Sequence, residues 1–334
     1  MERTHFGMLL AKAESTYGTD PTPTAGSNLI AVAKPGITYS PKFSHLSRMI
    51  LDGTLGKVAG HNVLPEVELS FRVEIRGNYT DGSTDSDISS GASAQALEIH
   101  PLLLACDLAA TYTAETSNGA RDGYVTYVPT VPTDEGSSVT FYYYSGLKLH
   151  KITGAKGNVK GSLEAGQMGV LDFTFKGIYN APTDAAIPSS PTWLNTKPPV
   201  FINSGSTVGS YSPVFQKLEF DLGNQIVTRQ DANATTGIRG FMIGDRQAKC
   251  SIDPESVAEA THPIWGDLYA ATARSIVGKV GTVAGNKFQG TFAGVSEAVA
   301  YGDRSGIRTQ AINYSIERAL ISDAISTEFA LKFY

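Results

Sequence analysis

The stretch "PEVELSFRVEIR", residues 65–76, alternates strictly between polar and apolar side chains. Successive side chains of a β-strand point to opposite faces of the sheet, so a period of two separates two faces. The stretch therefore predicts a long strand with one buried face and one charged, wet face, as is typical of an antiparallel sheet. The wet face carries Glu66, Glu68, Ser70, Arg72, Glu74 and Arg76, and the buried face carries Val67, Leu69, Phe71, Val73 and Ile75.

The same period recurs along the chain. Residues 169–179, "GVLDFTFKGIY", and 217–222, "KLEFDL", alternate in the same way, as does the C-terminal "STEFALKFY". Helix signals are few and consist of two His-Pro pairs followed by apolar runs, which predict short helices at 101–110 and 263–274. We expect a mainly β protein. Further strands are expected at 139–150, 157–164, 246–253, 276–282, 287–293, 295–301 and 308–317.

The two predicted helices begin with nearly the same phrase. Residues 100–111 read "HPLLLACDLAAT" and residues 262–272 read "HPIWGDLYAAT". In both halves of the chain the order is strand, helix, then sheet hairpin, which predicts two copies of one fold. A chance likeness of two helix starts is the alternative. The anchor residues of the repeat are His100, Pro101, Asp107, His262, Pro263 and Asp267.

A proline-rich segment separates the halves. Residues 181–199 hold five prolines, and such a segment favours an extended path outside a sheet. We therefore expect a first domain at 1–180, a linker at 181–199 and a second domain at 200–334. The polar segments 18–36 and 77–95 are expected to be surface loops or arms.

Composition limits the classes of function. The 334 residues are 41% hydrophobic and 18% charged with a net charge of −5, which predicts a packed core. No block of Lys or Arg is present, so sequence-specific nucleic-acid binding is not expected. Two cysteines do not make a disulfide framework and are expected to be buried free thiols. No signal peptide and no membrane-spanning run are expected, and the protein is expected to be made in a cytoplasm.

The sequence offers no catalytic constellation. None of the six histidines lies at metal-ligand spacing, and no phosphate-binding loop or nucleophile elbow occurs. His100 and His262 are expected to be structural. Asp81, Asp85 and Asp87 could offer carboxylates to calcium, but a solvated loop is favoured. The run Tyr142–Tyr144 could stack on bases, but packing or a subunit contact is favoured. We expect neither an enzyme nor a cofactor.

Two stretches resemble a known family. In "LLAKAESTYGTDPTPTAGSNLIAV", residues 9–32, the positions Lys12, Glu14, Tyr17, Gly18, Thr19 and Pro21 match the opening of major tail tube proteins of long-tailed, non-contractile bacteriophages. Residues 147–182 resemble that family's hairpin, with a glycine-marked turn before an alternating strand that closes in Gly-x-Tyr. The resemblance spans most of residues 1–182.

The resemblance implies a tube subunit. The family fold is a small β-sandwich or barrel with a flanking helix, and rings of six such folds stack into a channel for DNA. Two tandem folds joined by the proline-rich linker would make the ring a trimer with pseudo-sixfold symmetry, whereas a spurious repeat would leave a hexamer. The implied place is the virion tail. The implied partners are other copies of the chain, a tape-measure protein, tail terminator and tip proteins, and double-stranded DNA bound without specificity.

Residue roles follow from this resemblance. Glu66, Glu68, Ser70, Arg72 and Glu74 would face the lumen, where an acidic wall repels DNA. Ring-to-ring arms would include Tyr17, Pro21, Pro23, Asp81 and Asp85. One alternative is a receptor- or carbohydrate-binding β-sandwich adhesin, with Trp193 and tyrosines as stacking surfaces. Another is a hydrolase, which no pairing of nucleophile and base supports.

Overall fold

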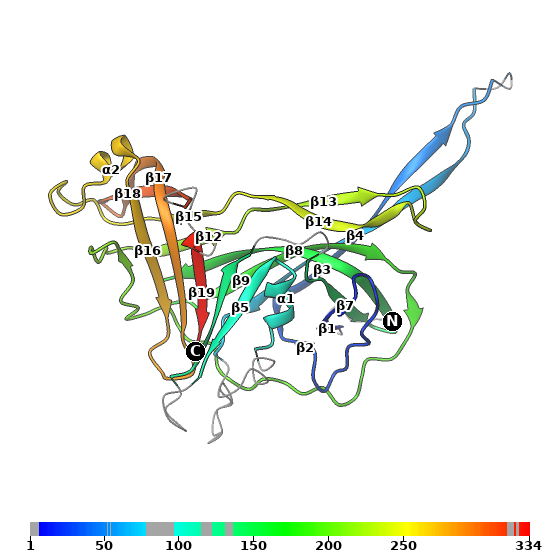
Figure 1. Ribbon diagram of the computed structural model, residues 1–334, viewed down its shortest axis with the longest axis horizontal. Coiled ribbons are helices and arrows are strands. Elements are labelled where there is room, and N and C mark those ends of the chain that lie inside the picture. Colours follow the sequence, from blue (N-terminus) through cyan, green and yellow to red (C-terminus); the bar gives the residue numbers. More distant parts are fainter. Residues whose placement is uncertain are drawn as a thin grey trace.

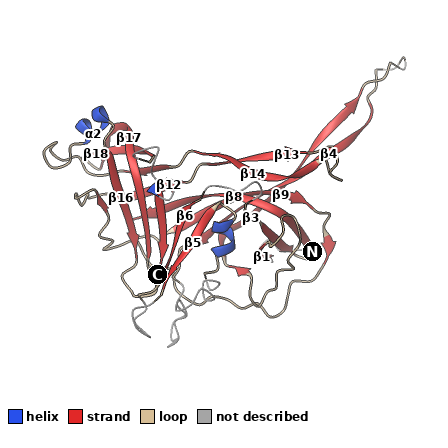
Figure 2. Ribbon diagram, in the orientation of Figure 1, coloured by secondary structure: helices blue, strands red, loops and turns tan. Residues whose placement is uncertain are grey.

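A computed structural model describes residues 7–51, 53, 55–77, 97–114, 122–130, 136–318, 324 and 327–334. The predicted mainly β fold is confirmed, with two short helices in the described part of the chain (Figure 2). Seventeen strands join one antiparallel sheet, and β13 (Asn224–Gln230) pairs with β14 (Ile238–Arg246) as a separate hairpin. The hairpin contacts β8 and β9 of the large sheet (Figure 1).

The N-terminal half supplies one run of the sheet, in the order β3, β4, β9, β8, β7, β1, β2. Burial in β4 alternates as predicted, with Val67, Leu69, Phe71 and Val73 inside. The predicted strand 139–150 instead ends at Ser145, because Gly146 turns the chain with φ of 61°. The predicted strand from 157 is part of one longer strand, β8. The bounds are β1 (Gly7–Ala13), β2 (Leu29–Ile30), β3 (Val32–Arg48), β4 (Val58–Glu74), β7 (Val139–Ser145), β8 (Lys148–Glu164) and β9 (Val170–Tyr179).

The C-terminal half continues the same sheet. The last five residues of β8 pair with β12, and the order then runs β12, β15, β18, β17. The two strands predicted at 287–293 and 295–301 are one strand, β17, whose first half lies between β16 and β19. The strand predicted at 246–253 is shorter in the structure, where β15 covers only Lys249–Ile252. The bounds are β11 (Thr207–Val208), β12 (Lys217–Asp221), β15 (Lys249–Ile252), β16 (Ala273–Val280), β17 (Phe288–Arg304), β18 (Ile307–Ile316) and β19 (Phe329–Phe333).

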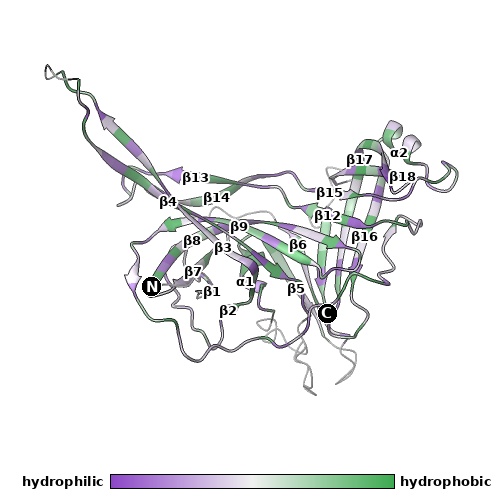
Figure 3. Ribbon diagram, turned by 180° about the vertical axis from the view of Figure 1, so that it is seen from behind, coloured by the Kyte–Doolittle hydropathy of each residue, from purple (hydrophilic) through white to green (hydrophobic). Residues whose placement is uncertain are grey.

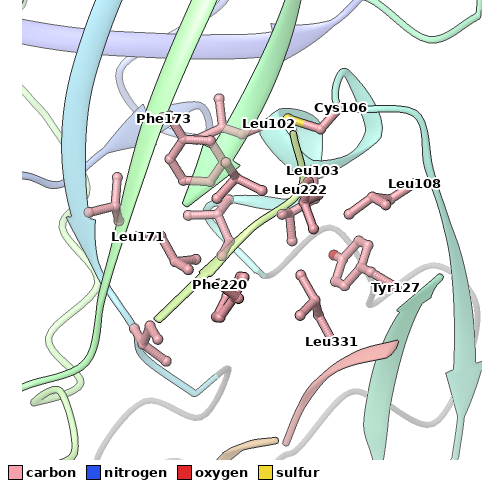
Figure 4. Packing of buried hydrophobic residues seen from close by; sticks show 14 of the residues in the cluster. Leu102, Leu103, Cys106, Leu108, Tyr127, Leu171, Phe173, Phe220, Leu222 and Leu331 are labelled. Atoms are coloured by element: carbon pink, nitrogen blue, oxygen red, sulfur yellow. The ribbon is translucent and has the colours of Figure 1, made fainter. Parts of the chain in front are cut away.

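The two halves of the chain interleave. β19, at the C-terminal end, pairs with β6 (Tyr124–Pro129), which pairs in turn with β5 (Leu108–Thr113) of the first half. One hydrophobic cluster holds Phe173 and Tyr127 together with Phe220 and Leu331 (Figure 4). The two halves therefore share a core. The division into tandem folds stays a prediction.

Both helices are shorter than predicted. α1 spans His100–Leu104 and α2 spans Ile264–Ala270. α1 ends early because Asp107 takes a left-handed φ of 56° and Leu108 already begins β5. α2 is followed by its cap residue Ala271, which is also left-handed with φ of 50°. Left-handed residues terminate helices because they cannot continue the right-handed turn.

The predicted burial of the two cysteines is confirmed. Cys106 and Cys250 are free thiols in the core, and burial raises the pKa of each. The tyrosine run also packs. Tyr142 and Tyr144 join a second apolar cluster with Leu10, while Tyr143 lies on the other face against Tyr39. The tyrosines take opposite faces because successive side chains of β7 alternate between the two faces of the sheet.

The proline-rich linker lies against the body of the protein. Ala185 and Ile187 cover the second apolar cluster. The linker was predicted to lie outside the sheet, but two of its residues pair with β8. These residues form β10 (Thr183–Asp184), which lies between prolines of the linker. Its far end is held by the Arg76 guanidinium, which donates to the Leu194 carbonyl.

A buried ion pair lies where β8 changes partners. β8 pairs with β7 up to Ala155 and with β12 from Lys160, so its backbone between them needs other partners on that edge. The Gly157 N–H donates to the Ala105 carbonyl of the α1 turn, and the Leu222 N–H donates to Val159. Within this gap the Lys156 ammonium lies 2.8 Å from the Asp107 carboxylate, with the side chains 1% and 3% exposed.

We expect Asp107→Asn to lower the free energy of unfolding by about 3–5 kcal/mol, because it leaves the Lys156 cation buried without its counter-charge. Asparagine tolerates the left-handed backbone at this position. The double variant Asp107→Asn with Lys156→Met removes both charges and should recover most of the loss. Chemical denaturation measures the difference.

The matched control for this prediction is Lys217→Met, which breaks the exposed ion pair with Glu219. It should change the free energy of unfolding by less than about 1 kcal/mol. Equal effects of Asp107→Asn and Lys217→Met would contradict the role assigned to the buried pair.

Candidate assembly surfaces

The predicted wet face of β4 is confirmed as the face away from the core. Glu66, Glu68, Ser70 and Glu74 are half-buried and Arg72 is exposed, while their neighbours along the strand are buried. Glu66 accepts a hydrogen bond from Thr228 of the β13–β14 hairpin, whereas Glu68 and Arg72 have partners on adjacent strands. Arg72 forms a two-bond ion pair with Asp172 of β9 at 2.7 and 2.8 Å, and Lys42 of β3 pairs with Glu68.

This polar face continues across both halves of the chain. Glu219 of β12, Ser251 of β15 and Asn313 of β18 follow in register on the side away from the core. Lys160 and Glu297 also line a shallow hollow of about 520 Å³ on this side. Figure 3 shows polar and apolar residues alternating along these strands. The strands β4, β9, β8, β12, β15, β18 and β17 thus present one polar surface, defined here as the polar face.

Charges of both signs are interleaved on the polar face. Lys160 pairs with Asp221 at 2.9 Å, and Lys249 pairs with Glu297 at 3.7 Å. Partial burial would raise the pKa of Asp221, but hydrogen bonds from Asn158, Lys160 and the Gly223 N–H together lower it. The hydrogen bond to Asp172 raises the pKa of Arg72. The surface is therefore a mixed one, not the uniformly acidic wall that the glutamates of β4 alone suggested.

The strands that carry the polar face end in two edges that have no strand partner within the described residues. β3 pairs only with β4, and residues 296–304 of β17 pair only with β18. Unpaired edges present rows of N–H and C=O groups that can accept a strand from another chain. They bound a run of eight antiparallel strands from β3 to β17.

The ends of β3 and β4 form a long hairpin that leaves the body. We define this arm as residues 41–65, which extends to the upper right in Figure 1. Its tip carries three apolar side chains, Met49, Leu51 and Leu55, which are 89%, 104% and 108% exposed. The arm is not among the predicted elements, although "MIL" at residues 49–51 is an apolar run outside all of them. Exposed apolar surface of this kind marks interaction sites.

The predicted arm at 18–36 packs on its own chain. The Tyr17 hydroxyl donates to the Gly154 carbonyl at 2.8 Å and accepts the Phe241 N–H at 2.6 Å, which ties the β13–β14 hairpin to β8. The Pro21 carbonyl accepts a hydrogen bond from the Lys12 ammonium, and Pro23 is buried. Asp81, Asp85 and Asp87 lie outside the described residues.

The anchor residues of the repeat are held in different ways. The His100 ring lies 2.8 Å from the Tyr127 hydroxyl, whereas His262 is buried and stacks on Tyr211 at 4.9 Å. Burial lowers the pKa of both histidines. Asp107 pairs with Lys156, and Asp267 forms two hydrogen bonds with Arg274 at 2.7 and 2.8 Å. Pro101 lies in the first turn of α1, whereas Pro263 precedes α2 as its cap residue.

In the described part of the chain, no group of three or more His, Cys, Asp or Glu side chains is arranged to hold a metal ion. None of the helices that the structure describes is long and apolar enough to cross a membrane. The features that remain are surfaces: the polar face, two open edges and the arm.

Comparison with known proteins identifies the family of this chain. No curated protein matches this chain. The family model described as phage tail tube protein matches residues 8–317, which is nearly the whole chain. The match extends well beyond the resemblance seen at residues 1–182 and covers both halves. The chain belongs to the phage tail tube protein family, a structural component of the virion tail.

Proposed function

We propose that this protein assembles into stacked rings whose joined sheets form the channel for genome delivery. The observation that carries the proposal is the run of eight antiparallel strands with a polar face and two open edges. Closure of sheets from several chains into one barrel would remove every open edge. The pairing would join residues 296–304 of one chain to β3 of the next.

The number of strands supports this junction. Eight is even, so β3 and β17 run in opposite directions, and β17 of one chain meets β3 of the next in antiparallel sense. Each half of the chain contributes four strands to the run, β3, β4, β9, β8 and then β12, β15, β18, β17. We infer that three chains make a ring of six four-strand groups. The repeated helix phrase supports the same symmetry.

The polar face would line the lumen, including Glu66, Glu68, Ser70, Arg72 and Glu74. Interleaved ion pairs leave few free cations for phosphates, so DNA and a tape-measure protein could pass without binding. The arm would reach an adjacent ring in place of the segment at 18–36, and the segment at 77–95 stays a second candidate for such a contact. Synthesis in the host cytoplasm and contacts with terminator and tip proteins are part of the proposal.

Electron microscopy of the assembled protein tests the symmetry. We expect rings or tubes with three chains around the axis, because each chain brings two four-strand groups. Averaging with sixfold symmetry should blur side-chain density, since the two halves differ in sequence. Equally sharp density under sixfold averaging, or a protein that stays monomeric at all concentrations, would contradict the proposal.

Neutralising acids on the polar face should slow genome delivery. Glu219→Gln with Glu297→Gln removes the ion-pair partners of Lys217 and Lys249, so these cations become more available to DNA phosphates. Tubes should still form, because each exposed pair contributes about 0–1 kcal/mol. Ejection rates from virions measured at several salt concentrations check this, with Asp184→Asn in the linker as control. An unchanged, salt-independent rate in the double variant would argue against a lumen position.

A further inference from the structure

The arm tip is an exposed apolar surface, and a second such surface lies far from it. The second surrounds α2, where the centroids of the Trp265 and Tyr301 rings lie 5.5 Å apart. Tyr269 lies one helical turn beyond Trp265. Tyr269 is 96% exposed, and Trp265 and Tyr301 are each about half exposed. We define these three side chains as the aromatic face. It lies at the opposite end of the long axis from the arm (Figure 1).

We propose that the arm tip of one copy docks on the aromatic face of another copy. The inference rests on the proposed function, since it names the surface that receives the arm. Within one chain the two surfaces cannot meet, because the body of the sheet separates them (Figure 1). A surface at one end that fits a different surface at the other end makes a head-to-tail contact, which builds rings or stacks instead of closed dimers.

The chemistry of the two surfaces is complementary. Met49, Leu51 and Leu55 offer flexible aliphatic side chains, and aromatic side chains are the anchors that interfaces favour. Two exposed cations, Arg48 and Lys57, flank the arm tip. Two exposed acids flank the aromatic face: Glu259, which accepts the Gly266 N–H, and Asp303. A cation also lies beside that face, since the Arg308 guanidinium is 5.0 Å from the centroid of the Tyr301 ring.

Disulfide trapping in assembled tubes tests this docking. Leu51→Cys with Tyr269→Cys in one chain should give covalent ladders of chains on mild oxidation. The native thiols do not interfere, because Cys106 and Cys250 are buried. The control pairs Leu51→Cys with Leu147→Cys, an accessible residue at the β7–β8 turn, and should give no ladder. Tubes of the first variant that give no ladder, or equal ladders in both variants, would overturn the docking and leave the tube function intact.

A second measurement does not depend on introduced thiols. Trp265→Ala with Tyr269→Ser should raise the protein concentration needed for tube formation about tenfold or more, because aromatic anchors dominate interface energetics. Trp193→Ala, at an exposed tryptophan in the linker, should leave that concentration unchanged. Unimpaired assembly of the aromatic-face variant would overturn the docking. The docking would also be overturned if the monomer bound glycans and Trp265→Ala abolished that binding. Failure of the unaltered chain to form rings would overturn the tube function as well.

Discussion

The backbone ladder of β8 is the interaction on which the rest of this structure depends. One edge of the strand pairs with β9, and the other edge is shared between β7 and β12, so both halves of the chain are bonded to one strand. The gap between these partners is closed by Ala105 and Leu222, with the Lys156–Asp107 pair beside it. Buried backbone groups need partners, so the turn after α1 is fixed by the needs of β8.

The continuity of the sheet through β8 gives the protein its polar face. If the halves packed as separate bodies, the wet side of β4 and that of β12 would belong to different surfaces. Pairing of Leu218 with Leu163 and of Glu219 with Ser162 instead places the polar residues of both halves on one side. A single surface with open edges at β3 and β17 suits closure with other copies, because only closure leaves no edge unpaired.

The repeated phrase at His100 and His262 illustrates what local likeness can and cannot establish. Both phrases begin short helices, as predicted, but their aspartates have different partners. Asp107 neutralises a buried lysine below the sheet, and Asp267 holds Arg274 at the start of β16. The run of eight strands takes four from each half of the chain, while β6 and β19 join across the halves. The tandem folds therefore stay a proposal.

The sequence by itself determined the mainly β class, the buried and wet faces of β4, β9 and β12, the two helix starts and the membership suggested by residues 9–32. These are local properties, because a period of two is written in neighbouring residues. Only the tertiary structure decided that β8 and β17 are single long strands, that β6 pairs with β19 from the far end of the chain, and that residues 41–65 leave the body as an arm. Strand order and open edges depend on pairing between distant segments, and alternation fixes which face a side chain takes but not which strand lies beside it.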